Sequence, residues 1–487
     1  MLRLSSRAVL IFTFASLLLA GVSRAADAPL PPREPAKLAA EFCASCHGPN
    51  LTGNVAPNLL DTQSNHGTDE ESVYRSIRDG WPLTGMTGFG HLLSEEEIRS
   101  LVTLIARQSN AFRFGRIPAP VPPSDAPRTS ELHTFRVETL AEGLDTPWGI
   151  TFLPGPGNRM LVTERAGRLR VLENDRLLPD PIRGLPEIWA RQDGGLLDVS
   201  LHPRYAENGW IYLAYSRPGI NADTSMTAVI RGRIRDGAWV EQEDIFRPGP
   251  ELFWVDNSHY GARFVWDKDE NLYYSLGDRG RPYQAQDLAS AVGKIHRVRD
   301  DGSPAPQNPF LFQPGALGTI WSYGHRHVQG LDFHPVTGHL WAAEHGPRAG
   351  GDELNRIEPG RNYGWPVISY GQPQIGEKIH GTEYPGMEQP VVHWTPTIAP
   401  AAVRFYTGDR FPKWKNHMLL TALSHQELRR IETNGDRVVH QEVLIKNEGR
   451  VRDVTTGPDG LIYIAFNNPG RIARLVPVVR SETTAVP

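Results

Sequence analysis

The stretch Trp148-Gly149-Ile150-Thr151-Phe152-Leu153-Pro154, followed by Met160-Leu161-Val162-Thr163-Glu164, decides the fold of most of the chain. It contains an apolar strand, a turn, a second apolar strand and then a polar loop. The same phrase returns near Leu197, Ala262, Gly330, Ala401 and Arg452. A repeated four-strand unit of this kind is typical of a β-propeller blade. The sequence therefore predicts an all-β six-bladed propeller over residues 130–480. A pair of β-sandwiches, the main alternative, would not explain the shared phrase.

Upstream of the repeats, the only two cysteines of the chain lie in Cys43-Ala44-Ser45-Cys46-His47. C-x-x-C-H is the pattern for covalent haem attachment, in which both thiols bond to the porphyrin and the histidine ligates the iron. A thioredoxin-like dithiol would need a surrounding βαβ pattern, and a zinc site would need a further Cys pair. The motif predicts one haem c, held by Cys43 and Cys46, with His47 as an axial ligand.

Helical patterns dominate residues 30–115 around this motif. A short helix from Pro35 delivers the cysteines, and two further helices begin at Thr68 and Ser94, each with a glutamate three residues later as a capping box. The final helix, expected over 94–106, has apolar residues at helical spacing. These patterns predict a small all-α domain.

A methionine between the second and third of these helices is the expected second ligand of the haem iron. Met86 is the only methionine in this region, and His66 and His91 are rivals for the same role. The haem motif, the Gly85-Met86 loop and the final helix together resemble a class I cytochrome c over roughly residues 35–110. This resemblance implies an electron-transfer domain.

The first residues of the chain predict export. Residues 1–25 contain Arg3 and Arg7, an apolar run from Val9 to Ala20 and the small residues of a cleavage site, which together are typical of a secretory signal peptide. The apolar run is too short to span a bilayer, although an uncleaved anchor is an alternative, and no later segment is expected to cross a membrane. Since haem c is normally attached outside the cytoplasm, we expect a periplasmic protein.

Composition and the segment between the domains add two expectations. The formal net charge of −4 gives no electrostatic argument for binding nucleic acid. Residues 116–129 are rich in proline without apolar periodicity, so a semi-rigid linker is expected there. Such a tether raises the effective concentration of one domain at the other.

Polar clusters open or close several repeats, and each admits two interpretations. His259, just before a strand, is of a type that accepts protons near neutral pH, although a loop histidine is usually a solvated surface group. The Gly346-Pro347 turn, with Asp352 nearby, offers oxygen ligands suited to Ca²⁺, or is simply a polar turn. Arg450 and Arg452, two residues apart in a strand, point the same way and suit a polyanionic ligand, unless both are solvated.

The propeller resembles the soluble PQQ-dependent aldose and glucose sugar dehydrogenase family over about residues 140–477. The resemblance rests on Gly194–Pro203, Ser258–Arg263, Gly277–Arg281, Gly324–Gly330, His345–Pro347, Asp352–Asn355, Asn362–Pro366 and Arg450–Val454. It implies that His259 takes the proton of the anomeric hydroxyl and that Arg326 stabilises charge on the quinone. It also implies a PQQ site and a Ca²⁺ site. By this resemblance, His327, His345, Arg450 and Arg452 are expected to contact PQQ, and Gly346, Pro347 and, through water, Asp352 are expected to hold Ca²⁺.

Several positions depart from the family pattern. Asp193 stands where glutamine is common, and His327 stands where asparagine is common. The expected PQQ-binding lysine is missing from 423–426, where Ser424 or His425 takes its place, and 349–351 is one residue longer than usual. These changes keep the His–Arg–Gly-Pro core but alter the wall of the expected pocket.

Both halves together predict an aldose dehydrogenase in which a sugar is oxidised to a lactone. Electrons would pass one at a time to the haem and then to a periplasmic or membrane acceptor. The alternative is a cytochrome carrier fused to a propeller that binds a carbohydrate or a partner without catalysis. A hydrolytic lactonase-type propeller fits the fusion poorly.

Overall fold

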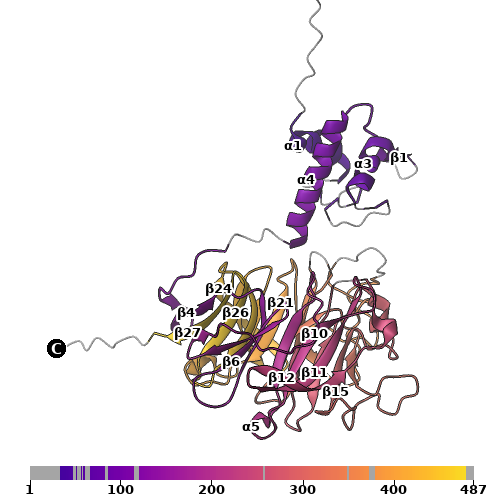
Figure 1. The fold of residues 1–487 in the computed structure, drawn as a ribbon. Coiled ribbons are helices and arrows are strands. Elements are labelled where there is room, and N and C mark those ends of the chain that lie inside the picture. Colours follow the sequence, from indigo (N-terminus) through magenta and orange to yellow (C-terminus); the bar gives the residue numbers. More distant parts are fainter. Residues whose placement is uncertain are drawn as a thin grey trace, which may run out of the picture.

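The computed structural model describes residues 33–47, 51, 56–57, 59–60, 66–67, 69–82, 86–114, 120–255, 258–347, 350–371 and 379–478. The expected signal peptide, Thr68, Gly85 and residues 348–349 lie outside the described residues, as does the signature residue Asn257. The described part forms a small helical domain followed by a β-propeller (Figure 1).

The helical domain is built from short segments around one long helix. In order they are α1 (Pro35–Leu38), the π-helix η1 (Ala39–Cys43), α2 (Ala44–His47), α3 (Glu70–Asp79), β1 (Gly80–Trp81), β2 (Met86–Thr87) and α4 (Glu95–Phe114). Its buried core gathers apolar side chains from these helices, among them Leu38, Ile77, Ile98, Leu101 and Val102.

The predicted helix starts are partly correct. Ser94 and Glu97 form the expected capping box, with the Glu97 amide donating to Ser94 Oγ at 3.2 Å and the Ser94 amide donating to Glu97 Oε2 at 3.0 Å. At α3 the cap is Asp69, which accepts a hydrogen bond from the Ser72 amide at 2.9 Å. The sequence placed this start one residue early because threonine and aspartate are both good N-caps. Helix α4 continues to Phe114, beyond the expected end at 106.

The propeller consists of six antiparallel sheets, which confirms the predicted six-bladed fold. The first two blades contain β5 (Pro147–Phe152), β6 (Met160–Glu164), β7 (Arg168–Glu173), β8 (Arg176–Leu177), β9 (Leu196–Leu201), β10 (Ile211–Pro218), β11 (Ser225–Arg235) and β12 (Ala238–Phe246). The next two contain β13 (Phe264–Trp266), β14 (Leu272–Leu276), β15 (Lys294–Val298), β16 (Ile320–Tyr323), β17 (Val328–Phe333), β18 (Leu340–Glu344), β19 (Asp352–Ile357) and β20 (Val392–Trp394).

The fifth blade contains β21 (Pro400–Phe405), β22 (Met418–Ala422), β23 (Glu427–Asn434) and β24 (Arg437–Lys446). The last contains β25 (Arg450–Thr456), β26 (Ile462–Asn468), β27 (Gly470–Pro477), β4 (Thr134–Glu142) and β3 (Arg128–Thr129). Strand β4 pairs with β27 in this blade, so the beginning and the end of the propeller sequence close the ring. Each repeated phrase supplies the first two strands of one blade.

A charged network joins three blades at the centre of the ring. The Arg263 guanidinium lies 3.2 Å from Asp198 Oδ1 and 3.0 Å from Asp453 Oδ1, and all three residues are fully buried. Asp198 and Asp453 occupy the same place in two copies of the repeated phrase. Buried charges of this kind are tolerated only when paired, so the network fixes how the blades meet.

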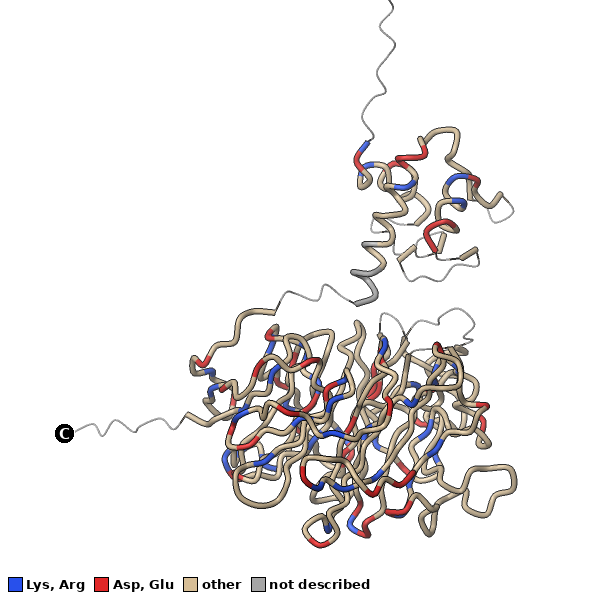
Figure 2. Tube along the Cα trace, in the orientation of Figure 1, with Lys and Arg blue, Asp and Glu red and all other residues tan. Residues whose placement is uncertain are grey.

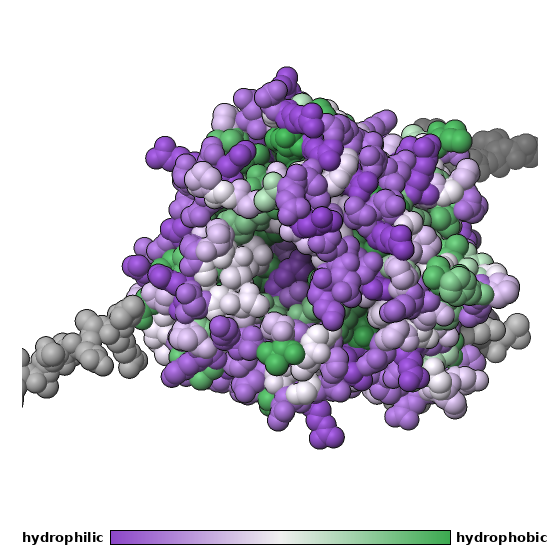
Figure 3. All heavy atoms as spheres, turned by 90° about the horizontal axis from the view of Figure 1, so that it is seen from below, coloured by the Kyte–Doolittle hydropathy of each residue, from purple (hydrophilic) through white to green (hydrophobic). Residues whose placement is uncertain are grey.

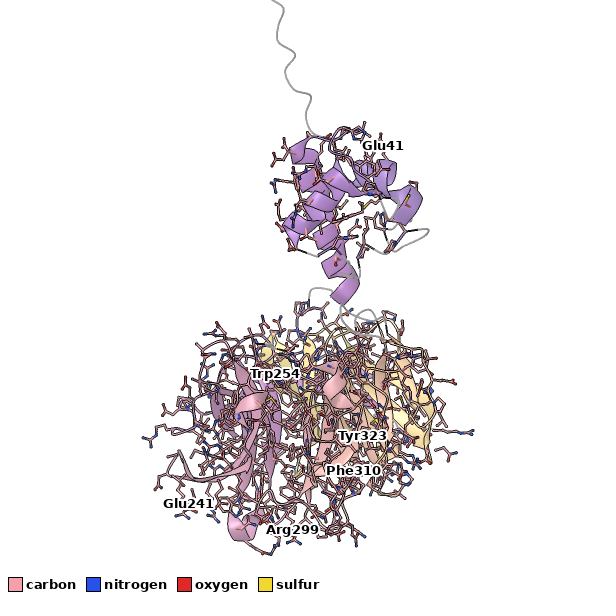
Figure 4. All side chains as sticks on the ribbon, turned by 90° about the vertical axis from the view of Figure 1, so that its right-hand side faces the viewer. Glu41, Glu241, Trp254, Arg299, Phe310 and Tyr323 are labelled. Carbon is pink, nitrogen blue, oxygen red and sulfur yellow. The ribbon has the colours of Figure 1, made fainter. Side chains whose placement is uncertain are left out.

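The alternating strand directions define two faces of the propeller. The ends of β14, β18, β22 and β26 share the upper face of Figure 1 with the starts of β13, β17, β21 and β25. Figure 4 shows Trp254 near this upper face and Glu241 and Arg299 near the lower one. The lower face has a hydrophilic central depression (Figure 3).

Charges of both signs are interspersed along the described chain (Figure 2), which agrees with the small net charge. No helix in the described segments is long and apolar enough to cross a membrane.

Candidate active site

A pocket of about 620 Å³ opens among the upper loops of the propeller. Seven of the predicted site residues line it together: Arg326, His327, His345, Gly346, Pro347, Arg450 and Arg452. Arg326 and His327 precede β17, the turn from His345 to Pro347 follows β18, and Arg450 and Arg452 lie at the start of β25. Segments at the start of a first strand and segments after a second strand both carry polar clusters that the sequence singled out. Blade closure therefore gathers residues that are distant in the chain.

His259 lies beside this pocket and is held by a buried carboxylate. Its Nδ1 is 2.7 Å from Asp278 Oδ1, and its ring centroid is 5.0 Å from that of His327. Asp278 Oδ2 accepts a hydrogen bond from Trp365 Nε1 at 2.7 Å. Burial would raise the pKa of the Asp278 carboxyl, but His259 and Arg326 hold it below its ordinary value. An ionised Asp278 requires a proton on His259 Nδ1, which leaves Nε2 as the proton acceptor.

The backbone around His259 is strained and closely packed. His259 has a φ of 53°, which is uncommon for a residue with a side chain. A Cβ on Gly277 would lie 2.0 Å from the His259 carbonyl oxygen, so only glycine fits there. After β14, Gly277 therefore leaves room for the His259 backbone. The next residue, Asp278, orients the His259 ring. The sequence motif contains Asp278 but does not by itself indicate this role.

A second chain of contacts fixes His327. Arg452 Nη1 donates to Gln329 Oε1 at 2.6 Å, and Gln329 Nε2 lies 3.1 Å from the Gly261 oxygen and 2.8 Å from His327 Nε2. Because the amide oxygen is taken by Arg452, the amide nitrogen donates to His327 Nε2. Burial, together with the charges around the pocket, lowers the pKa of His327 well below its usual value. His327 is thus a neutral imidazole with its hydrogen on Nδ1.

Arg326 is held through its backbone by an acidic residue at the end of β18. Its backbone amide donates to Glu344 Oε2 at 2.9 Å, and its guanidinium lies 5.3 Å from the Trp365 ring centroid. Arg326 Nη1 donates to the His345 carbonyl oxygen at 3.3 Å. Trp365 therefore contacts both Asp278 and Arg326, and it connects the base and the cation of the predicted site.

The pocket has more positive charge than its own carboxylates balance. Arg165, which no sequence motif singled out, lines the pocket together with Arg326, Arg450 and Arg452. Burial and the neighbouring Arg450 lower the pKa of Arg452 to about 9, because its charge is poorly compensated. Arg326 Nε and Arg452 Nε are buried without a hydrogen-bond partner among the described residues. These donors fit a planar ligand with several carboxylates, as PQQ is.

The Gly346-Pro347 turn also lines the pocket, but Asp352 is engaged elsewhere. Asp352 Oδ1 accepts from the Gly346 amide at 3.0 Å, and Oδ2 accepts from Thr397 Oγ1, the Ile398 amide and the Ala399 amide at 2.6–2.7 Å. The carboxylate is fully buried and holds the turn from behind. No group of three or more His, Cys, Asp or Glu side chains in the described segments is arranged to hold a metal ion. A cation here would rely on backbone carbonyls.

Three positions that depart from the family pattern lie on the pocket wall, namely Asp193, His327 and Ser424. Asp193 and Ser424 line the pocket, whereas His425 Nδ1 turns to within 3.6 Å of Glu427 Oε1. Of the two residues that could replace the expected lysine, Ser424 is therefore the one that lines the pocket. The Arg165 guanidinium supplies a further cation to the pocket lining, and its Nη1 donates to the Gln192 carbonyl oxygen.

The haem motif is arranged locally. Cys43 is buried and Cys46 is exposed, and His47 is buried with its Nδ1 2.6 Å from the Pro57 carbonyl oxygen. A metal-bound histidine commonly donates one ring nitrogen to a carbonyl in this way and presents the other to the metal. The residues therefore fit a covalent haem.

Met86 and its rivals occupy different surroundings. Met86 is half-buried in β2, whereas the half-buried His66 ring stacks on Trp81 with centroids 3.6 Å apart, and His91 is exposed. Stacking engages the His66 ring, and exposure sets His91 apart from the core. Met86 stays the predicted iron ligand.

Comparison with known proteins identifies both halves. The family profile described as Glucose / Sorbosone dehydrogenase matches residues 144–474, which is most of the chain. The chain belongs to this family. The profile described as cytochrome c oxidase, cbb3-type, subunit III matches residues 31–105, in agreement with the predicted cytochrome c domain.

Relatives in the glucose/sorbosone dehydrogenase family cover the propeller almost completely. Aldose sugar dehydrogenase YliI of Escherichia coli is 38% identical over 351 residues, covering 71% of this chain and 93% of its own. Quinoprotein glucose dehydrogenase B of Acinetobacter calcoaceticus is 27% identical, covering 79% and 95%. The solved PQQ-bound form of aldose sugar dehydrogenase from Streptomyces coelicolor is 28% identical, with a TM-score of 0.58, and covers 72% and 100%. The chain is therefore an oxidoreductase of the sugar dehydrogenase family with a haem-binding domain added.

Proposed function

We propose that the protein is a PQQ-dependent aldose dehydrogenase of the periplasm that passes electrons to its own haem c. One observation carries the proposal. The pair formed by buried Asp278 and half-buried His259 lies beside a pocket in which Arg326 and Arg452 have partnerless nitrogens in the described structure. Similarity to the named relatives supports the same activity.

The chain's own residues divide the work of sugar oxidation. His259 Nε2 accepts the proton of the anomeric hydroxyl, and Asp278 stabilises the imidazolium that results. Arg326 places positive charge where negative charge develops during the reaction. When bound, PQQ supplies a two-electron acceptor for the hydrogen of the sugar carbon, and haem c supplies a one-electron carrier.

The remaining pocket residues bind and orient. Arg165, Arg450 and Arg452 would hold the PQQ carboxylates, and His345 would contact the same cofactor. The carbonyl oxygens of Gly346 and Pro347 would hold Ca²⁺. His327 presents an Nδ1–H donor rather than a cation, because its Nε2 is occupied by Gln329.

The haem end of the pathway and the export signal complete the proposal. Cys43 and Cys46 would bond to the haem, with His47 and Met86 as axial ligands. Residues 1–25 would direct export. Reduced haem would then deliver electrons to a periplasmic or membrane acceptor.

The test uses the purified full-length holoprotein, loaded with PQQ and Ca²⁺ and mixed with a panel of aldoses. Reduction of the haem absorption bands by sugar is expected, and omission of PQQ should abolish it. If no aldose reduces the haem at saturating PQQ, the proposal is wrong. Tight PQQ-independent binding of a sugar or a partner would then favour the non-catalytic alternative.

A further inference from the structure

The segment before the propeller is fastened to it near the pocket. The Val121 amide donates to the Asn447 carbonyl oxygen at 2.7 Å, and the Arg128 guanidinium contacts the buried Glu448 carboxylate. Lower down, Glu131 Oε2 lies 2.9 Å from Arg430 Nη2. We call residues 121–131 the anchor segment. Its upper end is fixed to the loop that precedes Arg450, a pocket residue.

This fastening leaves a short tether. Helix α4 ends at Phe114, and the first anchored residue is Val121. A chain of that length reaches at most ~25 Å from Cα to Cα. A domain the size of 33–114 is itself roughly 30 Å across. The tether therefore keeps the helical domain close to the upper face, where the pocket opens.

An apolar patch lies across the pocket from the anchor. Ile220 is 100% exposed and Val255 is 63% exposed. Val255 directly follows half-buried Phe253 and Trp254, and Ile220 follows Gly219, where a Cβ would lie 2.9 Å from the Phe253 ring. We call these four residues the rim patch. They belong to the second blade and its connection to the third, whereas the anchor lies against the fifth and sixth. In a ring of six blades these positions are opposite.

The rim patch is connected to the base of the site. Trp254 Nε1 donates to the Arg279 carbonyl oxygen at 2.8 Å, and Arg279 Nη2 donates to the Ser225 carbonyl oxygen at 2.9 Å. The Arg279 guanidinium also lies 3.8 Å from the ring centroid of Tyr260, which lines the pocket. Exposed apolar clusters beside a site commonly mark interaction surfaces.

We propose that the helical domain of the same chain docks over the pocket mouth, with the anchor segment on one side and the rim patch on the other. The inference rests on the proposed function, since it explains how electrons leave the pocket. The face of the helical domain that carries the haem motif, residues 43–47, would meet the mouth, because the haem accepts the electrons there. Docking in this place makes haem reduction independent of protein concentration, because both partners belong to one chain.

The first test removes the rim patch with the double variant Ile220→Ser/Val255→Ser. The matched control is Phe312→Ser, which is 92% exposed in the loop that connects β15 and β16 at the lower face. In PQQ-loaded holoprotein, sugar-driven haem reduction should slow roughly tenfold in the double variant, as expected for loss of apolar burial. Turnover with a small diffusible dye should stay within about twofold in every protein, since the pocket is untouched. Equal haem-reduction rates in the double variant and the control would overturn the proposal.

The second test needs no sugar and so separates this inference from the proposed function. Val121→Pro/Arg128→Ala removes both upper fastenings of the anchor, with Arg235→Ala as a control for loss of an exposed ion pair on the lower face. Small-angle scattering should show a larger radius of gyration in the anchor variant. Hydrogen exchange at 250–255 should speed up in it. Unchanged scattering and exchange would contradict docking, even if dye turnover were absent. Haem-reduction rates that rise with protein concentration would instead indicate docking onto a second copy.

Discussion

The two halves of this protein assemble their sites in opposite ways. In the helical domain, both thiols and the histidine for the haem lie within 43–47, and two consecutive short helices, η1 and α2, position them. In the propeller, Gln329 and Arg452 meet across 123 positions of sequence, and pocket residues span Leu144 to Gly470. A local site is specified by a motif, whereas a dispersed site exists only once the ring closes. The effect of a substitution should therefore stay local in the helical domain. In the propeller it should extend to residues of other blades.

The largest effect is expected at the base. His259→Ala should lower sugar turnover roughly 10²–10⁴-fold, the range typical of a lost general base. Asp278→Asn should approach the same loss, because an amide does not fix the histidine tautomer as a carboxylate does. The haem spectrum should be unchanged in both. Steady-state kinetics with dye and with haem as acceptors give the measurement.

Asp269→Asn is the matched control, since Asp269 is exposed in the turn between β13 and β14. Full turnover in His259→Ala would remove His259 from the mechanism. Full turnover in Asp278→Asn with loss in His259→Ala would show that the base needs no partner.

The free energy of unfolding of the propeller should depend on pH because of one buried histidine. His296 is fully buried, stacked on Tyr274, with its Nε2 2.8 Å from the Ala291 oxygen. Burial lowers the pKa of His296 to about 4. The unfolded chain gains a proton at this residue near pH 6.5, before the folded one does, so stability falls as the pH drops from 6.5 to 4. The expected loss is about 3 kcal/mol.

The measurement is thermal unfolding of the propeller between pH 4 and 8, in the native protein and in His296→Gln. The stability of the variant should depend less on pH within that window. Parallel curves for the two proteins would contradict the assignment of the acid loss to His296.

The affinity for PQQ should depend on Arg452, whose partner Gln329 is distant in the sequence. Arg452→Ala removes a buried cation and also frees Gln329, so PQQ binding should weaken roughly 10–100-fold, as expected for lost hydrogen bonds to a charged group. PQQ titration followed by fluorescence quenching gives the affinity. Arg247→Ala, which loses an exposed cation with a 67% exposed side chain, is the control. Equal affinities in both variants would indicate that Arg452 does not contact the cofactor.

The smallest effect is expected from a local change in the helical domain. Ser94→Ala removes one half of the capping box of α4 and should destabilise the helical domain by about 1 kcal/mol. Ser94→Thr keeps a hydroxyl cap and should change stability little. Haem absorbance on heating follows this domain, while tryptophan fluorescence follows mainly the propeller. A matching shift of the propeller transition would show that the two halves unfold together.

Short motifs predict some parts of the propeller site, whereas other parts depend on neighbours from distant blades. Arg326, Arg450, Arg452 and the Gly346-Pro347 turn belong to recognisable motifs, and the structure gathers them in one pocket. The contributions of Arg165 and Gln329 were missed, because each resembles an ordinary polar residue of its strand or loop. Their importance arises from residues on other blades. The hydrogen-bond partners of Asp352 could not be inferred either, since most of them lie more than forty residues away.

The sequence alone determined the haem motif, the repeated blade phrase and therefore the number of blades. Those features depend on residues a few positions apart, where covalent connection fixes the geometry. Only the tertiary structure decided that Asp278 orients His259, that Gln329 sets the tautomer of His327, and that 121–131 fastens beside the pocket. The His259–Asp278 contact forms when one blade folds, whereas the Arg452 contact that orients Gln329 joins two different blades. The physical reason is the same in each case. The cost of burying a polar group is offset only by a partner that the fold, and not the local chain, supplies.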